Sequence, residues 1–387
     1  MKRPSHGRHG PGRSLVVVAS GLLAAAALTA AGASVQASAA QTQRDCPTSA
    51  VGHAKVGRLA GITHARSVRT GCAAHKGGDP AGGTPPLIFH GGPMMGTPRT
   101  GPVVVTPIYW NPNGHPMTSA YKNIITRYLG DVAAASNSHT NVFSTLREYY
   151  GSNGGIRYKV KLGGRVNDAG PLPADGCTVE ADDTSNIYAD GSGYDACIDD
   201  DQVIAETDRV VTARHLPRDL AHMYVLFLPQ HVESCFFAGS TATASNFCTI
   251  NHHPSAAYCA YHSQAPRGTV YGNLAFPIYD STTGFTCSSD AVYPTVQTPN
   301  HDADADTEVS PTSHEIMEAI TDPDTSTGWY DSSGFENGDE CAYVFGATHG
   351  ATGSLYNQVI NGHHYLTQEE FSNRDFARGG GGCLPGE

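Results

Sequence analysis

The sequence predicts one large domain of the α/β or α+β class, with a mixed sheet, packed helices and stabilising disulfides. First, apolar runs typical of strands alternate with segments of helical periodicity, an order that argues against an all-β sandwich. Second, ten cysteines, an even number, follow an N-terminal export signal, which favours disulfide formation. Third, 387 residues are enough to bury a substantial core, and no internal repeat divides them.

The predicted core elements follow one another through the first half of this domain. Residues 103–110 are apolar and β-branched, which predicts a buried strand despite Pro107. Residues 121–132 have apolar side chains at helical spacing, with Thr118 as a candidate N-cap. Further along, the same criteria predict a short helix, a strand, a helix and a strand, at 142–150, 156–162, 203–211 and 223–228.

The N-terminal region has the features of an export signal. Residues 1–39 combine basic residues, an apolar run and a small-residue cleavage site, as in a secretory signal peptide. Residues 40–85 end in a Gly- and Pro-rich stretch and predict a loosely ordered leader or linker, either a pro-segment or a disulfide-tied tail. The domain itself then covers 86–387, and no part of it has the roughly 18 apolar residues of a membrane helix.

The charge of the chain limits its partners. The formal net charge is −12 and becomes more negative once the basic signal peptide is removed. An acidic chain without a basic stripe is a poor candidate for binding nucleic acid or anionic membranes. We expect a protein released outside the cell, acting on an extracellular protein, a peptide or a cell-wall substrate.

The chain from Ser313 to Pro323 carries the strongest chemical signal. It contains His314-Glu315-x-x-Glu318, which differs by one residue from the His-Glu-x-x-His signature of zinc hydrolases. Ser310 as N-cap and a proline at the next position predict a helix of about three turns that ends near Thr321. Pro323 would stop it there.

Residues i and i+4 of a helix point the same way, so His314 and Glu318 can face one zinc ion. Glu315 would then be the catalytic residue that deprotonates a water molecule on the metal. This interpretation predicts a zincin-like domain. The alternative is a solvated His–Glu pair that stabilises the helix by a few tenths of a kcal/mol.

A third ligand is expected from the loop that follows the helix. Glu336 and Asp339 lie in a Gly-punctuated acidic stretch closed by a cysteine, and either can return to the helix. Asp324 competes, because it stands at the spacing used by a short metzincin-type motif. That motif needs a glycine at the turn, where this chain has Thr321. We therefore favour Glu336 or Asp339.

Two further groups are weaker candidates for metal ligation. His262, like His252 and His253, lies in a Tyr- and His-rich segment, where a histidine is more often an ordinary hydrogen-bonded residue than a ligand. A second group of acidic residues resembles the opening of a calcium loop but lacks its glycine, so a solvated acidic turn is the alternative to a calcium site: Asp302, Asp304 and Asp306.

The cysteines lack the close C-x-x-C spacing of a thiolate zinc site, so we expect disulfides rather than metal ligation. Sequence does not determine the connectivity. Plausible pairs are Cys46–Cys72, Cys177–Cys197 and Cys341–Cys383. The four cysteines that remain for two further bridges are Cys235, Cys248, Cys259 and Cys287.

The last quarter of the chain resembles the EXORDIUM, or phosphate-induced protein, family of secreted plant proteins and their bacterial relatives. That family carries Pro-Asn-x-Asp, His-Glu-x-x-Glu, an Asn-Pro or Asp-Pro turn, Trp-Tyr and Glu-x-Gly-Asp-x-Cys in this order. The matching segments here are Pro299-Asn300-His301-Asp302, His314 to Glu318, Asp322-Pro323, Trp329-Tyr330 and Glu336 to Cys341.

The resemblance extends more loosely over 86–387 and implies an extracellular protein linked to cell-wall growth responses. It carries over the constellation His314, Glu315, Glu318, Glu336 and Asp339, and it leaves Asp324 outside. No defined biochemical activity comes with it. Two hypotheses follow: a secreted zinc-dependent hydrolase, most simply a peptidase, or a non-catalytic extracellular or cell-wall-associated binding protein with a structural metal site or none.

Overall fold

The computed structural model describes the chain from residue 84 onward with internal gaps, together with two short strands before it. The described ranges are 62–63, 66–67, 84–179, 192–241, 247–249, 258–277, 285–289 and 292–387. All of them belong to one compact unit, Asp45–Glu387. The predicted signal peptide, the Cys46–Cys72 pair, His252 and His253 lie outside the described residues.

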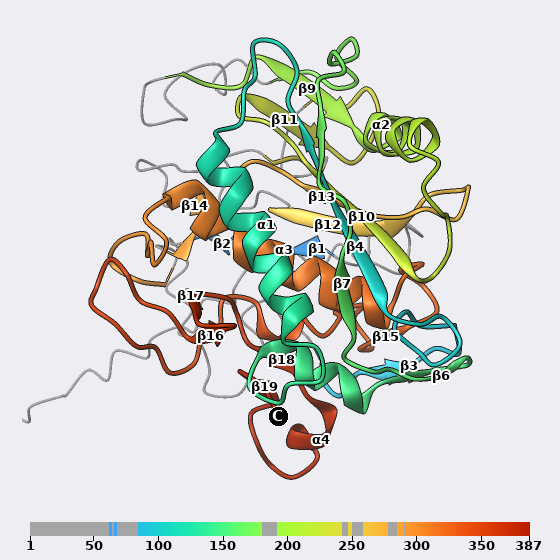
Figure 1. The fold of residues 1–387 in the computed structure, drawn as a ribbon, viewed down its shortest axis with the longest axis vertical. Coiled ribbons are helices and arrows are strands. Elements are labelled where there is room, and N and C mark those ends of the chain that lie inside the picture. The colour runs from blue at the N-terminus through green and yellow to red at the C-terminus, as the bar shows by residue number, and fades with distance from the viewer. Residues whose placement is uncertain are drawn as a thin grey trace, which may run out of the picture. The chain divides into compact units, whose positions relative to one another are not determined.

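A mixed sheet forms the centre of this unit, as predicted (Figure 1). Its strands follow the order β1-β12-β13-β10-β4-β7, with β8 also paired to β4. Parallel pairing joins β13, β10, β4, β7 and β8. At one edge, β12 and β1 are antiparallel to their neighbours. The bounds are β1 Ile62–Thr63, β4 Val103–Trp110, β7 Val160–Leu162, β8 Val166–Asp168, β10 His222–Phe227, β12 Ala260–Gln264 and β13 Val270–Leu274.

Helices and small two-stranded sheets complete the described part of the unit. The helices are α1 Ser119–Ala134, η3 Val142–Glu148, α2 Asp200–Ala213, α3 Ala303–Thr321, η7 Asp339–Cys341 and α4 Asn373–Phe376. The remaining strands are β2 Arg66–Ser67, β3 Ile88–Phe89, β5 Tyr150–Gly151, β6 Gly154–Gly155, β9 Ala196–Asp199, β11 Val232–Cys235, β14 Phe285–Thr286, β15 Trp329–Tyr330, β16 Gln358–Ile360, β17 His363–Tyr365, β18 Glu370–Phe371 and β19 Cys383–Leu384.

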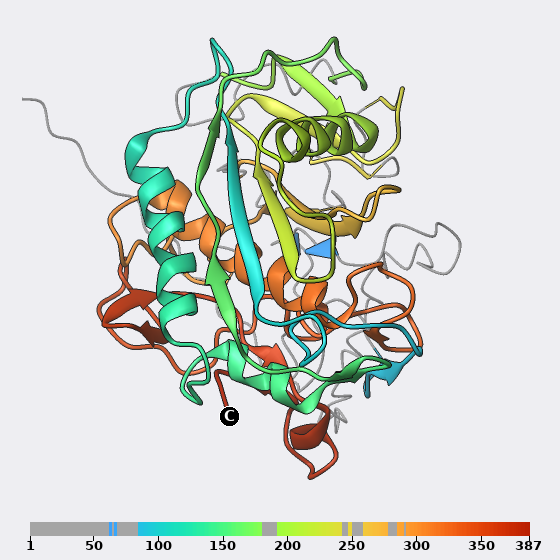
Figure 2. The ribbon, with the colours of Figure 1, turned by 45° about the vertical axis from the view of Figure 1, so that its right-hand side comes forward.

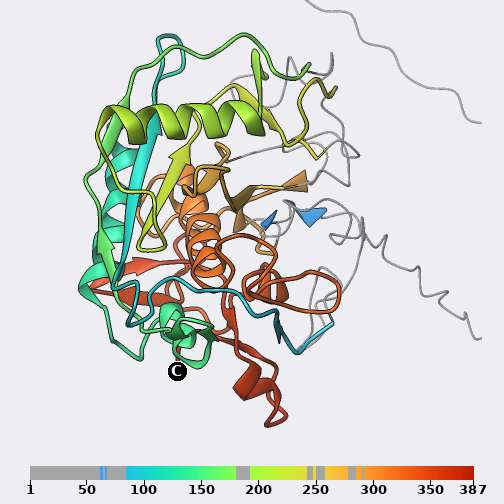
Figure 3. The same cartoon turned by 90° about the vertical axis from the view of Figure 1, so that its right-hand side faces the viewer.

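The two faces of the sheet bury separate cores. Successive residues of a strand point to opposite faces. In β10, Val225 therefore packs with the apolar stripes of α1 and α3, and Leu226 packs with α2 on the other face. The ribbon shows α1 and α3 on one side of the sheet and α2 on the other (Figure 2, Figure 3). Pro107 is accommodated within β4, where the adjacent Ile108 is fully buried. This arrangement fixes α3, which carries the His-Glu-x-x-Glu motif, directly beneath the sheet.

Local capping explains where the helices begin. The Thr118 hydroxyl accepts a hydrogen bond from the Tyr121 backbone N–H at 3.0 Å, which confirms the predicted N-cap of α1. The expected start of α3 at Ser310 is wrong. The helix begins eight residues earlier because the Asp302 carboxylate accepts from the Ala305 N–H at 3.0 Å and caps it. Pro311 therefore lies inside the helix.

Two other predicted boundaries differ from the structure. Of the predicted strand 156–162, only Val160–Leu162 forms a ladder, because the chain before it bonds to turns: the Arg157 N–H donates to the Gly96 carbonyl at 2.9 Å. The predicted leader also contributes two strands, since β1 pairs with β12 and β2 pairs with β14. The predicted end of α3 at Thr321 is confirmed.

Disulfides connect the described segments, and two of the predicted pairs are confirmed. Cys177–Cys197 and Cys341–Cys383 are bonded. The other four cysteines form Cys235–Cys248 and Cys259–Cys287. Within the described ranges, every helix is too short or too polar to cross a membrane.

We expect the double variant Cys341→Ser, Cys383→Ser to lose about 2–4 kcal/mol of unfolding free energy, since the bridge closes a 42-residue separation. Urea unfolding under non-reducing conditions measures the loss. The variant should also bind zinc more weakly, because Cys341 ends the short helix η7 that begins at Asp339. The matched control, Cys177→Ser with Cys197→Ser, should lose stability without changing zinc affinity. Unchanged affinity in both variants would contradict the prediction.

Candidate metal centre

Helix α3 brings three motif side chains into the interior of the unit. His314, Glu315 and Glu318 are all 0% exposed. One helical turn separates His314 from Glu318, and the His314 Nε2 lies 2.8 Å from the Glu318 Oε1. The alternative of a solvated His–Glu pair is therefore wrong, because neither group reaches water.

Asp339 completes a first group around His314. Its Oδ1 lies 3.6 Å from the His314 Nε2, and its backbone N–H donates to the Glu318 Oε1 at 3.0 Å. One ligand atom from each of His314, Glu318 and Asp339 lies within 4.8 Å of the others. Two ligands bound to one zinc ion at about 2.0–2.2 Å stand only a few ångströms apart, so this spacing suits a single cation.

The loop that supplies Asp339 depends on Gly338. A Cβ atom at this position would lie 2.8 Å from the His314 Cγ and Nδ1 and 2.9 Å from the Glu318 Oε1. Real Cβ atoms do not approach other heavy atoms so closely, so only glycine lets the loop backbone pass against both side chains. The glycine of the Glu-x-Gly-Asp sequence thus allows the loop backbone to pass close to His314 and Glu318.

Asn337 ties the same loop to its neighbours. Its side-chain oxygen accepts a hydrogen bond from the Thr321 hydroxyl at 2.9 Å, at the end of α3. Its side-chain nitrogen donates to the Glu370 Oε2 at 3.1 Å, on β18. Both groups are fully buried, so these bonds hold the loop in one position relative to the helix.

Gln368 supports the His314 ring from the other side. Its amide nitrogen lies 2.9 Å from the His314 Nδ1 and 2.7 Å from the Gly338 carbonyl oxygen. It thereby orients the ring so that Nε2 points at Glu318 and Asp339. Gln368 also lines a cavity of about 20 Å³, together with Ser310, enough space for about one water molecule.

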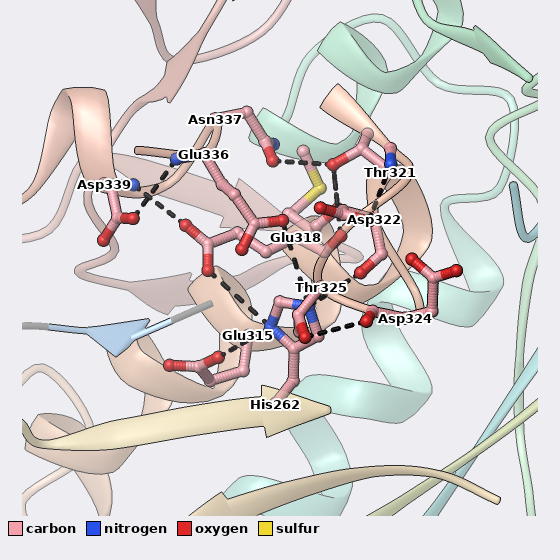
Figure 4. Close-up of polar contacts among 12 residues, drawn as sticks. His262, Glu315, Glu318, Thr321, Asp322, Asp324, Thr325, Glu336, Asn337 and Asp339 are labelled. Atoms are coloured by element: carbon pink, nitrogen blue, oxygen red, sulfur yellow. Dashed lines mark hydrogen bonds and ion pairs between the residues drawn. The ribbon is translucent and has the colours of Figure 1, made fainter. Parts of the chain in front are cut away.

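His262 is a buried, hydrogen-bonded histidine, as expected, and it also belongs to a metal-compatible group. It lies on β12 and is 0% exposed. Its Nδ1 is 3.2 Å from the Glu315 Oε2 and 3.7 Å from the Glu318 Oε2, and its Nε2 lies 3.0 Å from the Asp322 carbonyl oxygen (Figure 4). Its only sequence signal was its place in a Tyr- and His-rich segment, which does not distinguish a ligand from an ordinary histidine.

Glu336 stands with His262 rather than with His314. One ligand atom from each of His262, Glu318 and Glu336 lies within 4.8 Å of the others. The Glu336 Oε1 is 3.9 Å from the His262 Nε2. The two residues that sequence left as alternatives, Glu336 and Asp339, thus occupy different sides of Glu318.

Several ligand-type atoms of these residues lack a hydrogen-bond partner within the described structure. They are fully buried and belong to both groups: His314 Nε2, Glu318 Oε2, Glu336 Oε1 and Oε2, and Asp339 Oδ1. An unpaired buried polar atom costs about 1–3 kcal/mol, and more if charged. A cation at the centre would satisfy them, so the residues present fit a metal.

Burial and the charges of neighbouring groups shift the pKa values of the side chains in the centre. Burial, followed by the charge of Glu315, raises the pKa of Glu318 well above its usual range. Burial and the Glu318 carboxylate likewise raise the pKa values of Glu336 and Asp339. Burial alone lowers the pKa of His262, but the hydrogen bond and charge of Glu315 outweigh it, so that pKa is raised.

The other predicted ligands lie elsewhere. The Asp324 side chain accepts from the Ser326 and Thr327 backbone N–H groups at 3.1 and 2.9 Å, so it stabilises the turn after α3. Asp302 is the N-cap of α3, and Asp306 bonds to Asn300. Among the described residues, no metal-compatible group includes the three acids of the expected calcium site.

Three cysteines also lie close together but leave no free thiolate. Cys177 and Cys197 are bonded to each other, and Cys235 is bonded to Cys248. A thiolate is the form of cysteine that binds zinc. The expectation that cysteines do not ligate a metal therefore holds for this group.

Comparison with known proteins does not identify the chain. No protein-family model matches it, and neither a curated protein nor a solved structure does. What the centre does must therefore be inferred from its own residues.

We expect Gly338→Ala to weaken zinc binding at least tenfold and to destabilise the protein by about 1–3 kcal/mol, as overpacking in a core does. The new methyl group must displace the His314 ring or the Glu318 carboxylate. Gly164→Ala is the matched control, because a Cβ there meets nothing within 4 Å. Isothermal titration with zinc and thermal unfolding measure both effects. Equal behaviour of the two variants would contradict the role of Gly338.

The metal-free protein should lose stability as the pH rises from about 4 through 7. Unfolded Asp and Glu titrate near pH 4. Burial raises the pKa of Asp322 to about 7, and those of Glu318, Glu336 and Asp339 also rise. Their raised values stabilise the folded state below the unfolded pKa, and this contribution is lost as the pH passes the folded one.

Thermal unfolding in a chelator across this pH range measures the effect. Added zinc should offset the loss near neutral pH, because it binds the folded state. A chelated protein whose melting temperature is constant or rises over this range would contradict the prediction.

Proposed function

We propose that the protein is a zinc-dependent hydrolase that cleaves peptide bonds. His314, Glu318 and Asp339 hold the metal, and Glu315 is the general base. The observation that supports this most directly is the buried convergence of the three ligand atoms, within 4.8 Å of one another, without sufficient protein partners. One imidazole and two carboxylates form an acceptable zinc ligand set.

A zinc ion held there would polarise a carbonyl group and acidify a bound water. The protein supplies the proton acceptor and the positioning. Glu315 is adjacent in sequence to the ligand His314, and its Oε2 accepts from the His262 ring at 3.2 Å. This contact holds the carboxylate in place, and Gln368 holds the His314 ring. Both features favour a base with a fixed position relative to the metal.

A second function is favoured by one specific observation. None of the three ligands is more than 1% exposed. Structural zinc sites are closed, whereas catalytic sites keep an open position for water or substrate. The alternative is therefore a non-catalytic binding protein in which the same ion stabilises the fold.

The cellular setting is part of the proposal. Disulfides, the predicted signal peptide and the acidic charge support a protein secreted outside the cell. The resemblance to the EXORDIUM family supports a role at the cell wall, with a protein, peptide or wall component as substrate. Because the protein is acidic, nucleic acid and anionic membranes are poor candidates for its partners.

Glu315→Gln should keep zinc and the fold but lower peptide hydrolysis by at least about 100-fold, because an amide cannot accept the proton. His314→Ala should lose one equivalent of zinc and the same activity. Metal analysis, circular dichroism and cleavage of fluorescent casein measure these effects. Normal turnover by Glu315→Gln would rule it out as the base. A zinc-bound wild type that cleaves neither casein nor a peptide library would favour the non-catalytic function.

A further inference from the structure

The two oxygens of Glu318 face different partners. The Oε1 lies 2.8 Å from the His314 Nε2, in the first group. The Oε2 lies 3.7 Å from the His262 Nδ1, in the second group. We propose that the centre binds a second divalent cation, held by His262, Glu318 and Glu336, and that the Glu318 carboxylate bridges the two ions.

The spacing of the ligand atoms in the second group, His262, Glu318 and Glu336, suits one cation. The His262 Nδ1 lies 3.7 Å from the Glu318 Oε2, and one ligand atom from each of His262, Glu318 and Glu336 lies within 4.8 Å of the others. The 3.7 Å distance exceeds a hydrogen bond and leaves room for an ion between the two atoms. Figure 4 shows the carboxylates of Glu318 and Glu336 and the ring of His262 directed toward one another.

The environment of His262 prepares one ring nitrogen for ligation. The Nε2 lies 3.0 Å from the Asp322 carbonyl oxygen, which can only accept a hydrogen bond. Nε2 therefore keeps its proton, and Nδ1, which donates to Glu315 in the metal-free protein, is the nitrogen that would release its proton and bind the cation beside Glu318. A backbone carbonyl that holds the distal N–H is a usual support of metal-binding histidines.

Glu336 carries the strongest indication of a missing partner. Both of its carboxylate oxygens are buried without a hydrogen-bond partner, and the residue is 0% exposed. The Glu318 Oε2 is in the same condition. A cation between these oxygens satisfies them together.

The number of buried carboxylates also supports a second cation. The centre buries four carboxylates that contact its two histidines or each other: Glu315, Glu318, Glu336 and Asp339. One divalent cation offsets two negative charges. When these four carboxylates are ionised, a second divalent cation offsets the two charges that remain, and an uncompensated buried charge is costly.

The chemistry of the ligands indicates the class of ion. Each group offers one imidazole and two carboxylates, with Glu318 shared, a set that suits zinc and similar first-row divalent ions. Carboxylate-bridged ions in two-metal sites stand about 3.5–4 Å apart. The second site rests on the proposed function through Glu318, which both sites share, and through His262, which contacts the general base Glu315. Glu336 takes no part in the first site.

The test is zinc stoichiometry of the full-length chain, stripped with a chelator and titrated with zinc. Wild type should bind two equivalents, and Glu336→Gln and His262→Gln should each bind one. Asp339→Asn should also bind one, and Glu318→Gln should lose both sites or weaken each at least tenfold. Glu369→Gln, which removes a neighbouring acid outside both groups, should keep two.

Cobalt(II) substitution gives a second readout that does not need activity. Two carboxylate-bridged cobalt ions should couple magnetically and lose part of their paramagnetic resonance signal, which Glu336→Gln should restore. One equivalent in wild type that is retained by Glu336→Gln and lost by Asp339→Asn would overturn the second site and leave the proposed function standing. No zinc at all in folded wild type would overturn both.

Discussion

Concentrated negative charge inside the protein is the constraint that the rest of this structure serves. Buried carboxylates from α3, from the loop residue Glu336 and from Asp339 at the start of η7 meet there, and two imidazoles of the described residues stand among them. Buried charges of one sign raise the pKa values of their neighbours and destabilise the fold unless a cation or a proton neutralises them. Both the metal centre and its supports follow from this requirement.

The scaffold meets the requirement with rigid elements rather than with loops alone. Helix α3 continues through Pro311, where a backbone hydrogen bond is lost at a cost of about 3 kcal/mol, and its apolar stripe under the sheet offsets that loss. The antiparallel strand β12, between β1 and β13, brings His262 over the helix. The backbone at Gly338 then passes close enough for Asp339 to face His314.

Local patterns predicted the parts of the fold that depend on local physics. The β-branched run of β4, the Thr118 cap and the stop at Pro323 are short-range effects, and all were predicted from sequence. The start of α3 was not: Ser310 was predicted as the N-cap, whereas the Asp302 carboxylate caps the helix eight residues earlier. Sequence spacing identified His314 and Glu318.

Contacts between segments far apart in the sequence determine the positions of the other residues of the centre. His262 lies 53 residues before Glu315, and only the pairing of β12 with β13 brings the two together. Spacing along the loop also left Glu336 and Asp339 equivalent. The turn at Gly338 separates them, so that each faces a different histidine. Neither distinction is encoded in a local motif.

The contact between Gln368 and His314 also determines when the centre can form during synthesis. Gln368 follows His314 by 54 residues, and Cys383 follows its partner by 42. While the chain is being made, α3 emerges long before the segments that orient its histidine and fasten its acidic loop. Its carboxylates are then still hydrated, and an isolated His–Glu pair binds an ion weakly. If the proposed metal binds, it would therefore bind late, to an almost folded domain, and would not nucleate folding.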